Sequence, residues 1–427
     1  MRKGLLSVIL IFLSSILCAA SVRGVNIEDT FESTDNLSLF TFTGDVDDAS
    51  YYDDVHFHLV TQAPGDEVYT WFGHTGLMME SPQGSIMFDW GTFSFSPSFY
   101  LDFCFGRLYY TVSTNRADAV INRAISENRR VEITELPMDA AAKKGLMEFL
   151  AYNTQKENRN YLYHYYLDNC ATRVRDIIDF TGGGAFRAWA ESIMTGMTFR
   201  DLSTLYMNRN WLVSFTLNFL QGPSIDRQLN LYEACFLPDV LNSAVKTFYS
   251  LDGNVVFQGE DENNENLPLV CTTLMISLAL TLILFLLRHF RHERLYGLVS
   301  AVIWLYTGIA SSVLFFMMFF TNHDVTYFNE NLIFMNPLVF IIAFQNIAAV
   351  FRPGKTRKAS MYAARILLIL SMTDIVLKGL FPLSFIQDNA PVFAFILPLY
   401  LLTAFPEKER KPQISEKETD CRHMNAR

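Results

Sequence analysis

Long apolar stretches separated by short polar segments dominate the last third of the chain. Each stretch is long enough to cross much or all of the roughly 30 Å of hydrocarbon as a helix. There are five of them, of which the last is short: residues 269–287, 295–320, 332–351, 366–385 and 392–405. The pattern predicts an all-α membrane domain of five transmembrane helices over residues 269–405.

Charged residues between these stretches predict how the helices are oriented. Arginine and lysine gather in one set of segments: residues 288–294, 352–365 and 406–427. The alternate loops, residues 321–331 and 386–391, contain neither. Because basic segments face the cytoplasm in membrane proteins, we expect the tail, residues 406–427, to be cytoplasmic. The region before the first helix, residues 21–267, is then expected outside the cytoplasm.

The N-terminus has the three parts of a secretory signal. Two basic residues precede an apolar run over residues 5–17, and small residues follow. We predict a signal peptide over residues 1–20; if it were retained, it would add a sixth span without changing the orientation. Lipidation at Cys18 is disfavoured because Leu17 is too bulky for that processing site.

Between the signal and the first span, strand patterns come before most of the helical patterns. Alternating apolar residues predict strands over three segments: residues 56–61, 73–79 and 85–90. Helical spacing follows over four segments: residues 117–129, 139–153, 171–180 and 202–220. This order is typical of an α+β domain. We place the domain at residues 55–259, after an acidic segment (residues 21–54) and before an acidic linker (residues 260–268).

Composition and motifs exclude several classes of function. The 427 residues are 50% hydrophobic, and 34 basic against 44 acidic residues give a net charge of −10. These values exclude disorder and argue against a nucleic-acid partner.

No glycine-rich phosphate loop and no Cys-x-x-Cys pattern occurs in the sequence, so no cofactor is expected. His56 and His58 alternate on one strand face but lack a third ligand at useful spacing, so no metal is expected.

Three of the six cysteines belong to the outward domain: Cys104, Cys170 and Cys235. An odd number of cysteines in an oxidising compartment leaves at least one thiol without a partner in the domain. A disulfide between Cys104 and Cys235 would leave Cys170 free, although the sequence alone does not select this pairing.

Cys170 stands at a predicted helix start, where its chemistry would change. Asp168 or Asn169 can cap this helix, and in its first turn the unpaired N–H groups and the helix dipole favour the thiolate. His74 is the best partner, because the glycines beside it let a substrate or another backbone come close. Asp89, near the end of the next strand, would orient the imidazole. The alternatives are a small core cysteine, a structural histidine and a solvated carboxylate.

Several separated motifs occur in order around these residues: LVTQAPGD at 59–66, FGHT at 72–75, FDWGTFSF at 88–95, DNCATR at 168–173, and His323 with NENLIFMNPL at 329–338. Together these motifs resemble the Lnb family, the lipoprotein N-acyltransferases of Bacteroidetes-type bacteria. The resemblance covers residues 55–405, about four fifths of the chain. A more distant resemblance, of a strand histidine that precedes a cysteine at a helix start, implies the permuted papain- or NlpC-like thiol fold of the lecithin:retinol acyltransferase relatives.

The resemblance implies a reaction and a location. Cys170 is the expected nucleophile and His74 the expected base, with Asp89 as the orienting group. An acyl chain would pass from a phospholipid, through a cysteine thioester, to the N-terminal amine of a diacylglyceryl-cysteine lipoprotein. The protein would lie in the bacterial inner membrane with its outward domain in the periplasm. Two alternatives stay open: a thiol hydrolase or amidase of cell-wall peptide or lipid, and a membrane scaffold without enzymatic activity.

Further polar residues are candidates for substrate contact. Arg173, one turn after the cysteine, would contact the donor phosphate, or else be a solvated charge or part of a structural ion pair. Asn169 is a second candidate in the same motif. His323 and Asn331 lie at the outward ends of the second and third spans. Polar side chains near lipid are costly without a role, so these two would bind head groups or cap the outward domain.

Overall fold

The computed structural model describes residues 52–93, 97–259, 267–352 and 357–405. The predicted signal peptide, the tail, and most of the acidic segment and of the linker lie outside the described residues. The chain divides into two compact units. The first contains the described residues up to Thr273, among them the predicted α+β domain over residues 55–259, together with residues 313–332 and 380–392. The second contains the rest of the hydrophobic helices.

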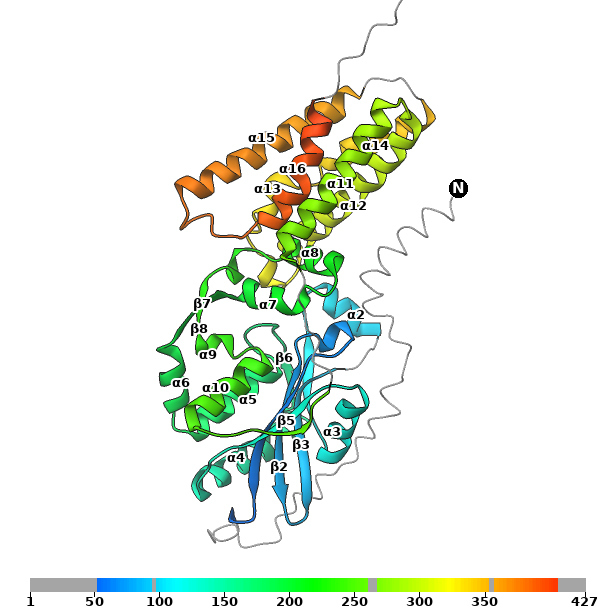
Figure 1. The fold of residues 1–427 in the computed structure, drawn as a ribbon. Coiled ribbons are helices and arrows are strands. Elements are labelled where there is room, and N and C mark those ends of the chain that lie inside the picture. Colours follow the sequence, from blue (N-terminus) through cyan, green and yellow to red (C-terminus); the bar gives the residue numbers. More distant parts are fainter. Residues whose placement is uncertain (1–51, 94–96, 260–266, 353–356, 406–427) are drawn as a thin grey trace, which may run out of the picture. The chain divides into compact units, whose positions relative to one another are not determined.

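A seven-stranded antiparallel sheet forms the centre of the first unit (Figure 1). Its strand order is β6-β4-β3-β2-β1-β5-β9. The bounds are β1 His56–Gln62, β2 His74–Ser81, β3 Gly84–Thr92, β4 Tyr109–Arg116, β5 Val131–Glu135, β6 Asn160–Leu162 and β9 Asn254–Phe257. The three predicted strands, β1 to β3, are confirmed and pair in sequence order. A separate two-stranded sheet joins β7 (Met194–Thr198) to β8 (Gln228–Asn230).

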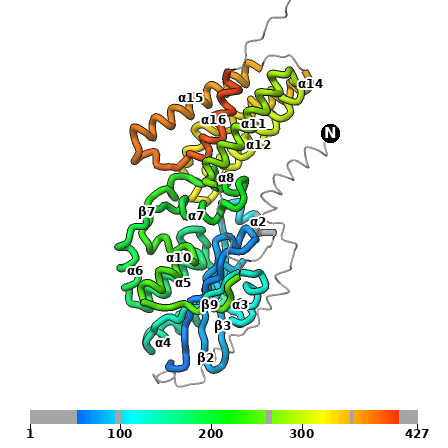
Figure 2. The backbone as a smooth tube through the Cα atoms, in the orientation of Figure 1, coloured from blue at the N-terminus to red at the C-terminus, as the bar shows by residue number. Residues whose placement is uncertain are grey.

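Helices cover both faces of the large sheet (Figures 1 and 2). Their bounds are α2 Pro97–Cys104, α3 Ala117–Ser126, α4 Ala140–Asn153, α5 Cys170–Thr181, α6 Ala185–Glu191, α7 Phe199–Met207, α8 Trp211–Leu220, α9 Leu231–Ala234 and α10 Pro238–Tyr249. Phe57 and Leu59 of β1 are fully buried on the face that packs against α4, α5 and α10. Val60 and Val131 belong to the opposite face, which α3 covers. Alternate strand residues thus enter two separate apolar cores.

The predicted mixture of strands and helices is confirmed, but one predicted helix is divided. Residues 202–220 belong to α7 and α8, which are separated by residues 208–210. The side chain of Asn210 accepts hydrogen bonds from the backbone N–H groups of Leu212 and Val213 at 3.0 and 3.2 Å. This asparagine therefore caps α8 and begins a new helix.

The C-terminal region is helical, as predicted. Its helices are α11 Leu269–His289, α12 Glu293–Phe320, α13 Asn331–Phe334, α14 Val339–Phe351, α15 Lys358–Leu380 and α16 Ala390–Ala404. Among the described residues, three of them, α11, α12 and α15, are long and apolar enough to cross a membrane, whereas α14 and α16 are apolar but shorter. The predicted helix over residues 332–351 is interrupted between α13 and α14, where Pro337 lacks a backbone donor.

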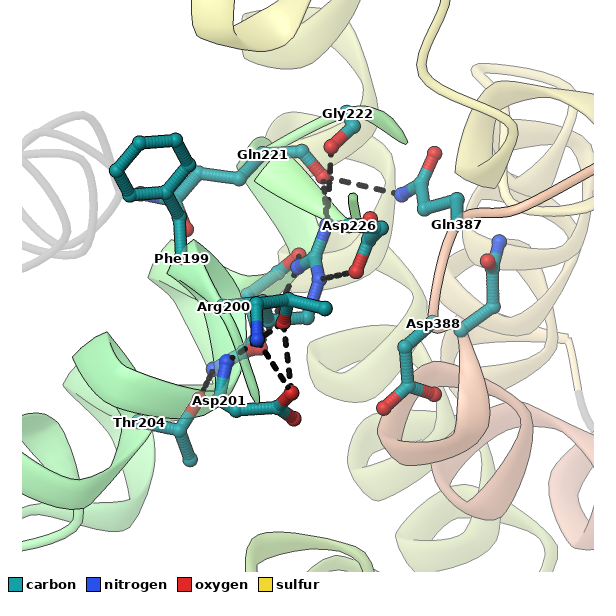
Figure 3. A network of polar contacts seen from close by, with 12 residues as sticks. Phe199, Arg200, Asp201, Thr204, Gln221, Gly222, Asp226, Gln387 and Asp388 are labelled. Carbon is teal, nitrogen blue, oxygen red and sulfur yellow. Dashed lines mark hydrogen bonds and ion pairs between the residues drawn. The ribbon is translucent and has the colours of Figure 1, made fainter. Parts of the chain in front are cut away.

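A buried arginine organises one end of the first unit. Figure 3 shows Arg200 of α7 pointing toward Asp226, to which its Nε and Nη2 donate at 2.7 and 2.9 Å. The same guanidinium donates to three backbone carbonyl oxygens, those of Asn218, Gln221 and Gly222, at 2.9, 2.9 and 3.1 Å. Both side chains of the pair are nearly inaccessible, with 3% and 4% exposure. Arg200 therefore fixes the chain that follows α8.

Two loops between hydrophobic helices dock on this fixed segment within the first unit. The N–H of Gly222 donates to the carbonyl of Val325 at 2.7 Å. Gln387 Nε2 donates to the carbonyl of Gln221 at 3.0 Å. The Arg200 network thus joins the outward domain to loop residues that lie about 100 and 165 positions further along the chain.

Replacing Arg200 with methionine is expected to destabilise the first unit strongly. The change leaves Asp226 and three carbonyl groups buried without their charged donor, which costs about 3–5 kcal/mol. Heat-dependent proteolysis of the full chain in detergent measures the loss. The matched control is Arg227→Met, which removes an ion pair whose arginine is 47% exposed, at an expected cost below about 1 kcal/mol. Equal sensitivity of the two variants would contradict the assignment.

Candidate active site

Cys170 is the first residue of α5, and the residue before it holds the helix start in place. The side chain of Asn169 accepts hydrogen bonds from the N–H groups of Ala171 and Thr172, both at 2.9 Å, and Thr172 Oγ1 accepts from the Asn169 N–H at 2.7 Å. Asn169 Nδ2 donates to the carbonyls of Tyr165 and Phe236. The predicted cap is confirmed as Asn169. Because this side chain is buried and fully hydrogen-bonded, it positions the cysteine, and its contact with substrate stays a prediction.

The structure brings all three predicted catalytic side chains together. The register of β2 and β3 places Leu77 opposite Phe88, so His74 and Asp89 lie diagonally across the strand pair. His74 Nε2 and Asp89 Oδ1 are 2.9 Å apart. Cys170 is hydrogen-bonded to the His74 side chain, and since Nε2 faces Asp89, Nδ1 is the ring nitrogen left for the thiol.

The glycines beside His74 serve two different purposes. At Gly73, whose φ is +74°, a Cβ would lie 2.8 Å from the carbonyl oxygen of Gln62, so this glycine allows the close backbone approach that the sequence predicts. At Gly76 a Cβ would lie 2.9 Å from Asp89 Oδ1 and 2.7 Å from Met87 Sδ. The space at Gly76 is therefore filled by the Asp89 and Met87 side chains. A role for this glycine in positioning the carboxylate was not anticipated from sequence.

The charges on Cys170, His74 and Asp89 stabilise each other. Burial alone would raise the pKa of the Cys170 thiol, but the attraction of His74 and hydrogen bonds from His74 and from the backbone N–H groups of Thr75 and Ala171 lower it below its ordinary value. Burial would likewise lower the pKa of His74, yet Cys170 and Asp89 raise it to about 10. The site therefore favours the thiolate, paired with an imidazolium, more than water favours the thiolate of an isolated cysteine, and the thiolate is the nucleophilic form.

Gly76→Ala is expected to reduce activity about 10²-fold, because the new Cβ pushes Asp89 away from His74 and a displacement of about 1 Å costs that much. Since Asp89 helps to raise the pKa of His74, the thiolate should form at higher pH in this variant, as alkylation of Cys170 across pH would show. The control is Gly145→Ala in α4, where a Cβ meets nothing within 4 Å. It should leave the activity unchanged. An unaltered alkylation profile in Gly76→Ala would refute the positioning role.

A neutral aromatic surface borders the thiol. Tyr110 and Tyr161 are paired on β4 and β6, and Tyr110 stacks on Tyr163 with ring centroids 4.3 Å apart. Burial, and then the charge of Cys170, raise the pKa of Tyr161 and Tyr163, so both phenols stay neutral. At Gly91 a Cβ would lie 3.8 Å from the Cys170 Cβ. Aromatic rings and a residue without a side chain suit the approach of an apolar substrate.

Arg173 is held by an ion pair. Its guanidinium donates through Nε to Asp168 Oδ1 and through Nη2 to Asp168 Oδ2, the latter at 2.7 Å. It also lies over the ring of Tyr161, 4.2 Å from the centroid. These contacts match the structural alternative. The side chain keeps 30% exposure, and its contact with a donor phosphate stays a prediction.

His323 and Asn331 use their side chains within the first unit. His323 Nε2 donates to the carbonyl of Phe103 at 2.8 Å, and Asn331 Nδ2 donates to the carbonyl of Phe219 at 2.9 Å. Asn329 Nδ2 donates to the same Phe219 carbonyl at 3.0 Å. Both predicted residues are buried. Their contacts are those of a cap on the outward domain, and head-group binding by them stays a prediction.

The structure does not contain the pairing of Cys104 with Cys235 that the sequence left open. Within the described residues, Cys104, Cys170, Cys235 and Cys271 are all free. Cys104 ends α2 at the surface, whereas Cys235 is fully buried after α9. Burial raises the pKa of the Cys235 thiol to about 12, so this thiol is inert.

The described residues contain no group of three metal-ligating side chains. The two histidines that alternate on β1 contact carboxylates of neighbouring strands. His56 Nδ1 lies 2.7 Å from Glu135 Oε1, and His58 Nε2 lies 3.1 Å from Glu80 Oε2. These pairs account for both histidines as polar contacts between strands.

The described residues form an α/β domain, in which a cysteine contacts a histidine, and a set of hydrophobic helices, three of which are candidate membrane spans. This is the architecture of a membrane protein with a folded region outside the lipid. Family models identify both parts. Residues 44–204 match the Lnb N-terminal periplasmic domain, and residues 261–405 match the Lnb transmembrane domain. The chain belongs to the Lnb family, as the sequence resemblance implied. Searches of curated proteins and of solved structures gave no match. Membership of this family indicates a membrane enzyme of lipoprotein maturation.

Proposed function

We propose that this protein is a thiol acyltransferase that moves an acyl chain from a phospholipid to the N-terminal amine of a diacylglyceryl-cysteine lipoprotein. The observation that carries the proposal is the contact between Cys170, at the start of α5, and His74, which lies 2.9 Å from Asp89. A thiolate paired with an imidazolium that a carboxylate orients is the arrangement that attacks acyl carbons. Family membership supports lipoprotein maturation as its context.

In the first half-reaction the Cys170 thiolate attacks the ester carbonyl carbon of the phospholipid. A C–S bond forms, the ester C–O bond breaks, and the His74 imidazolium gives its proton to the departing glycerol oxygen. The products are an acyl thioester and a lysophospholipid. The tyrosine surface beside the thiol suits the acyl chain because it is apolar and uncharged.

In the second half-reaction the α-amine of the lipoprotein attacks the thioester carbon. His74, now neutral, accepts the amine proton as the C–N bond forms and the C–S bond breaks. The thiolate and the imidazolium are regenerated, and the lipoprotein carries an amide-linked acyl chain. Asp89 keeps the imidazole in place through both halves and itself gains no proton.

The proposal includes a fold and a topology. His74 begins a strand and Cys170 begins a helix later in the chain, which is the order of the permuted papain- or NlpC-like thiol enzymes. We propose that α14 and α16 cross the inner membrane as short spans beside α11, α12 and α15, which makes five. After removal of residues 1–20, the catalytic domain then lies in the periplasm and residues 406–427 in the cytoplasm.

Isotope transfer in a purified system tests the function. The full chain is reconstituted with a phospholipid that carries a labelled acyl chain and with a synthetic diacylglyceryl-cysteine peptide. Mass spectrometry should find the label as an amide on the peptide and an equal amount of lysophospholipid. Labelled free fatty acid without peptide acylation would identify a hydrolase instead. No consumption of any phospholipid class would favour the scaffold alternative.

A further inference from the structure

Large apolar side chains are exposed around the end of α2. Leu101, Phe103 and Phe105 are 66%, 40% and 41% exposed, although they lie within five residues of one another. Cys104, the last residue of the helix, is exposed as well. Single exposed apolar residues are common on soluble domains, but a contiguous group marks a surface that meets another apolar phase or partner. We call Leu101, Phe103 and Phe105 the α2 turn.

The α2 turn contacts the end of a candidate membrane span within the first unit. The ring of Phe105 packs edge-on against that of Phe316, with centroids 5.8 Å apart. The backbone N–H of Asn322 donates to the carbonyl of Phe105 at 2.8 Å. Phe316 lies four residues before the end of α12 at Phe320, which is about 6 Å along the helix axis. A side chain that touches Phe316 therefore lies about one helical turn from the end of this candidate span.

The backbone fixes this contact closely. At Gly106, directly after the α2 turn, a Cβ would lie 2.6 Å from the carbonyl carbon of Asn322 and 2.6 Å from the nitrogen of His323. Gly106 also has a φ of +73°, which favours glycine. The turn is thus held against the segment after α12 by backbone packing, with no room for an intervening side chain.

Exposed aromatic residues continue from the span onto the α2 turn. On the last turns of α12, Phe316, Phe319 and Phe320 are 41%, 58% and 62% exposed, as suits residues that face lipid. Phe103 and Phe105 extend the same kind of surface beyond the end of the helix. Aromatic side chains are the residues that membrane proteins place at the boundary between hydrocarbon and head groups.

From this continuity we propose that the α2 turn is inserted into the outer face of the lipid bilayer, so that phospholipids of the outer leaflet cover Leu101, Phe103 and Phe105. This membrane contact is separate from the span itself and belongs to the outward domain. It does not depend on the proposed acyl transfer. It sets one end of the domain at the depth of the phospholipid ester groups.

A nitroxide label on Cys104 tests the insertion directly. The full chain is prepared with Cys18, Cys170, Cys271 and Cys421 changed to serine, labelled, and reconstituted at low density in phosphatidylethanolamine–phosphatidylglycerol vesicles. The matched control carries Cys104→Ser and Ser126→Cys, which moves the label to an exposed position at the end of α3. Collision rates with oxygen, which concentrates in lipid, and with a water-soluble nickel chelate are measured at both positions.

Insertion predicts an oxygen-to-nickel collision ratio several-fold higher at residue 104 than at residue 126. Equal ratios at the two positions would place the α2 turn in water and overturn the proposal. A label at residue 104 that is shielded from both reagents would also overturn it, because the turn would then be covered by protein, such as a second copy of the chain. All three results are independent of whether the enzyme transfers acyl groups.

Discussion

Cells that rely on a Cys170→Ser variant are expected to contain lipoproteins without the N-linked acyl chain. Serine is close in shape to cysteine, but His74 cannot convert its hydroxyl into the anion, so the rate should fall on the order of 10³-fold or more. Mass spectrometry of lipoprotein N-terminal peptides, at matched membrane levels of protein, measures the loss. The exposed Cys104 and the buried Cys235 remain in this variant, so another thiol is available if the assignment is wrong.

The matched control for this experiment is Cys271→Ser, which makes the same chemical change at an exposed cysteine of α11. It should leave acylation at the wild-type level. Full acylation by Cys170→Ser would exclude a thioester at this residue. Loss of acylation in both variants, with normal protein levels, would show that the substitution acts through something other than the nucleophile.

His74→Ala is expected to produce the second largest effect, a loss of about 10²–10⁴-fold in the rate of transfer. It should also change how Cys170 responds to pH. In the wild type His74 lowers the pKa of the thiol, so alkylation by iodoacetamide should begin at a lower pH than alkylation of an ordinary thiol. Without the imidazolium, the attraction that lowers the pKa of the Cys170 thiol is lost, so the effect of burial, which raises this pKa, becomes larger in comparison. Alkylation of the variant should then begin only near or above pH 8.5, the ordinary thiol value.

The control for the pH experiment is His56→Ala, at a histidine that is 43% exposed and paired with Glu135. Its alkylation profile should match that of the wild type. A profile of His74→Ala that coincides with the wild type would show that the thiolate is stabilised without this histidine. In that case the helix start and the N–H groups of Thr75 and Ala171 would be sufficient to stabilise the Cys170 thiolate.

The parts of the site that depend on local sequence could be predicted. Asn169 accepts hydrogen bonds from the N–H groups of the residues two and three positions further along the chain. This helix cap can therefore be recognised from the sequence motif alone. The strands that carry His74 and Asp89 are predicted by the alternation of apolar residues along the chain. The role of Gly76 depends on the register between β2 and β3, which a single sequence does not specify.

Other elements escaped prediction because tertiary contacts override the local pattern. In β5, Glu132 is 3% exposed, and its carboxylate lies 2.5 Å from Lys246 Nζ. A buried acidic residue weakens the hydrophobic signal by which a strand is recognised. The sequence allows a lipid contact for Asn331 because it does not reveal the hydrogen-bond partner of this side chain. That partner, the carbonyl of Phe219, is 112 residues away in the chain. The sequence shows several tyrosines shortly before Cys170. Their stacking with Tyr110 depends on the pairing of β4 with β6, which cannot be recognised from the sequence alone.

The docking of the two outer loops has a practical consequence for anyone who expresses the periplasmic region alone. A fragment that ends near residue 259 would lose Asn329 and Asn331, and with them both side-chain donors to the Phe219 carbonyl. It would also lose the Val325 carbonyl that receives the Gly222 N–H. Unsatisfied backbone groups in an interior are costly, so such a fragment should be poorly soluble. A soluble version would need the two loops grafted back onto it, because the sequence boundary near residue 260 does not separate independently folding pieces.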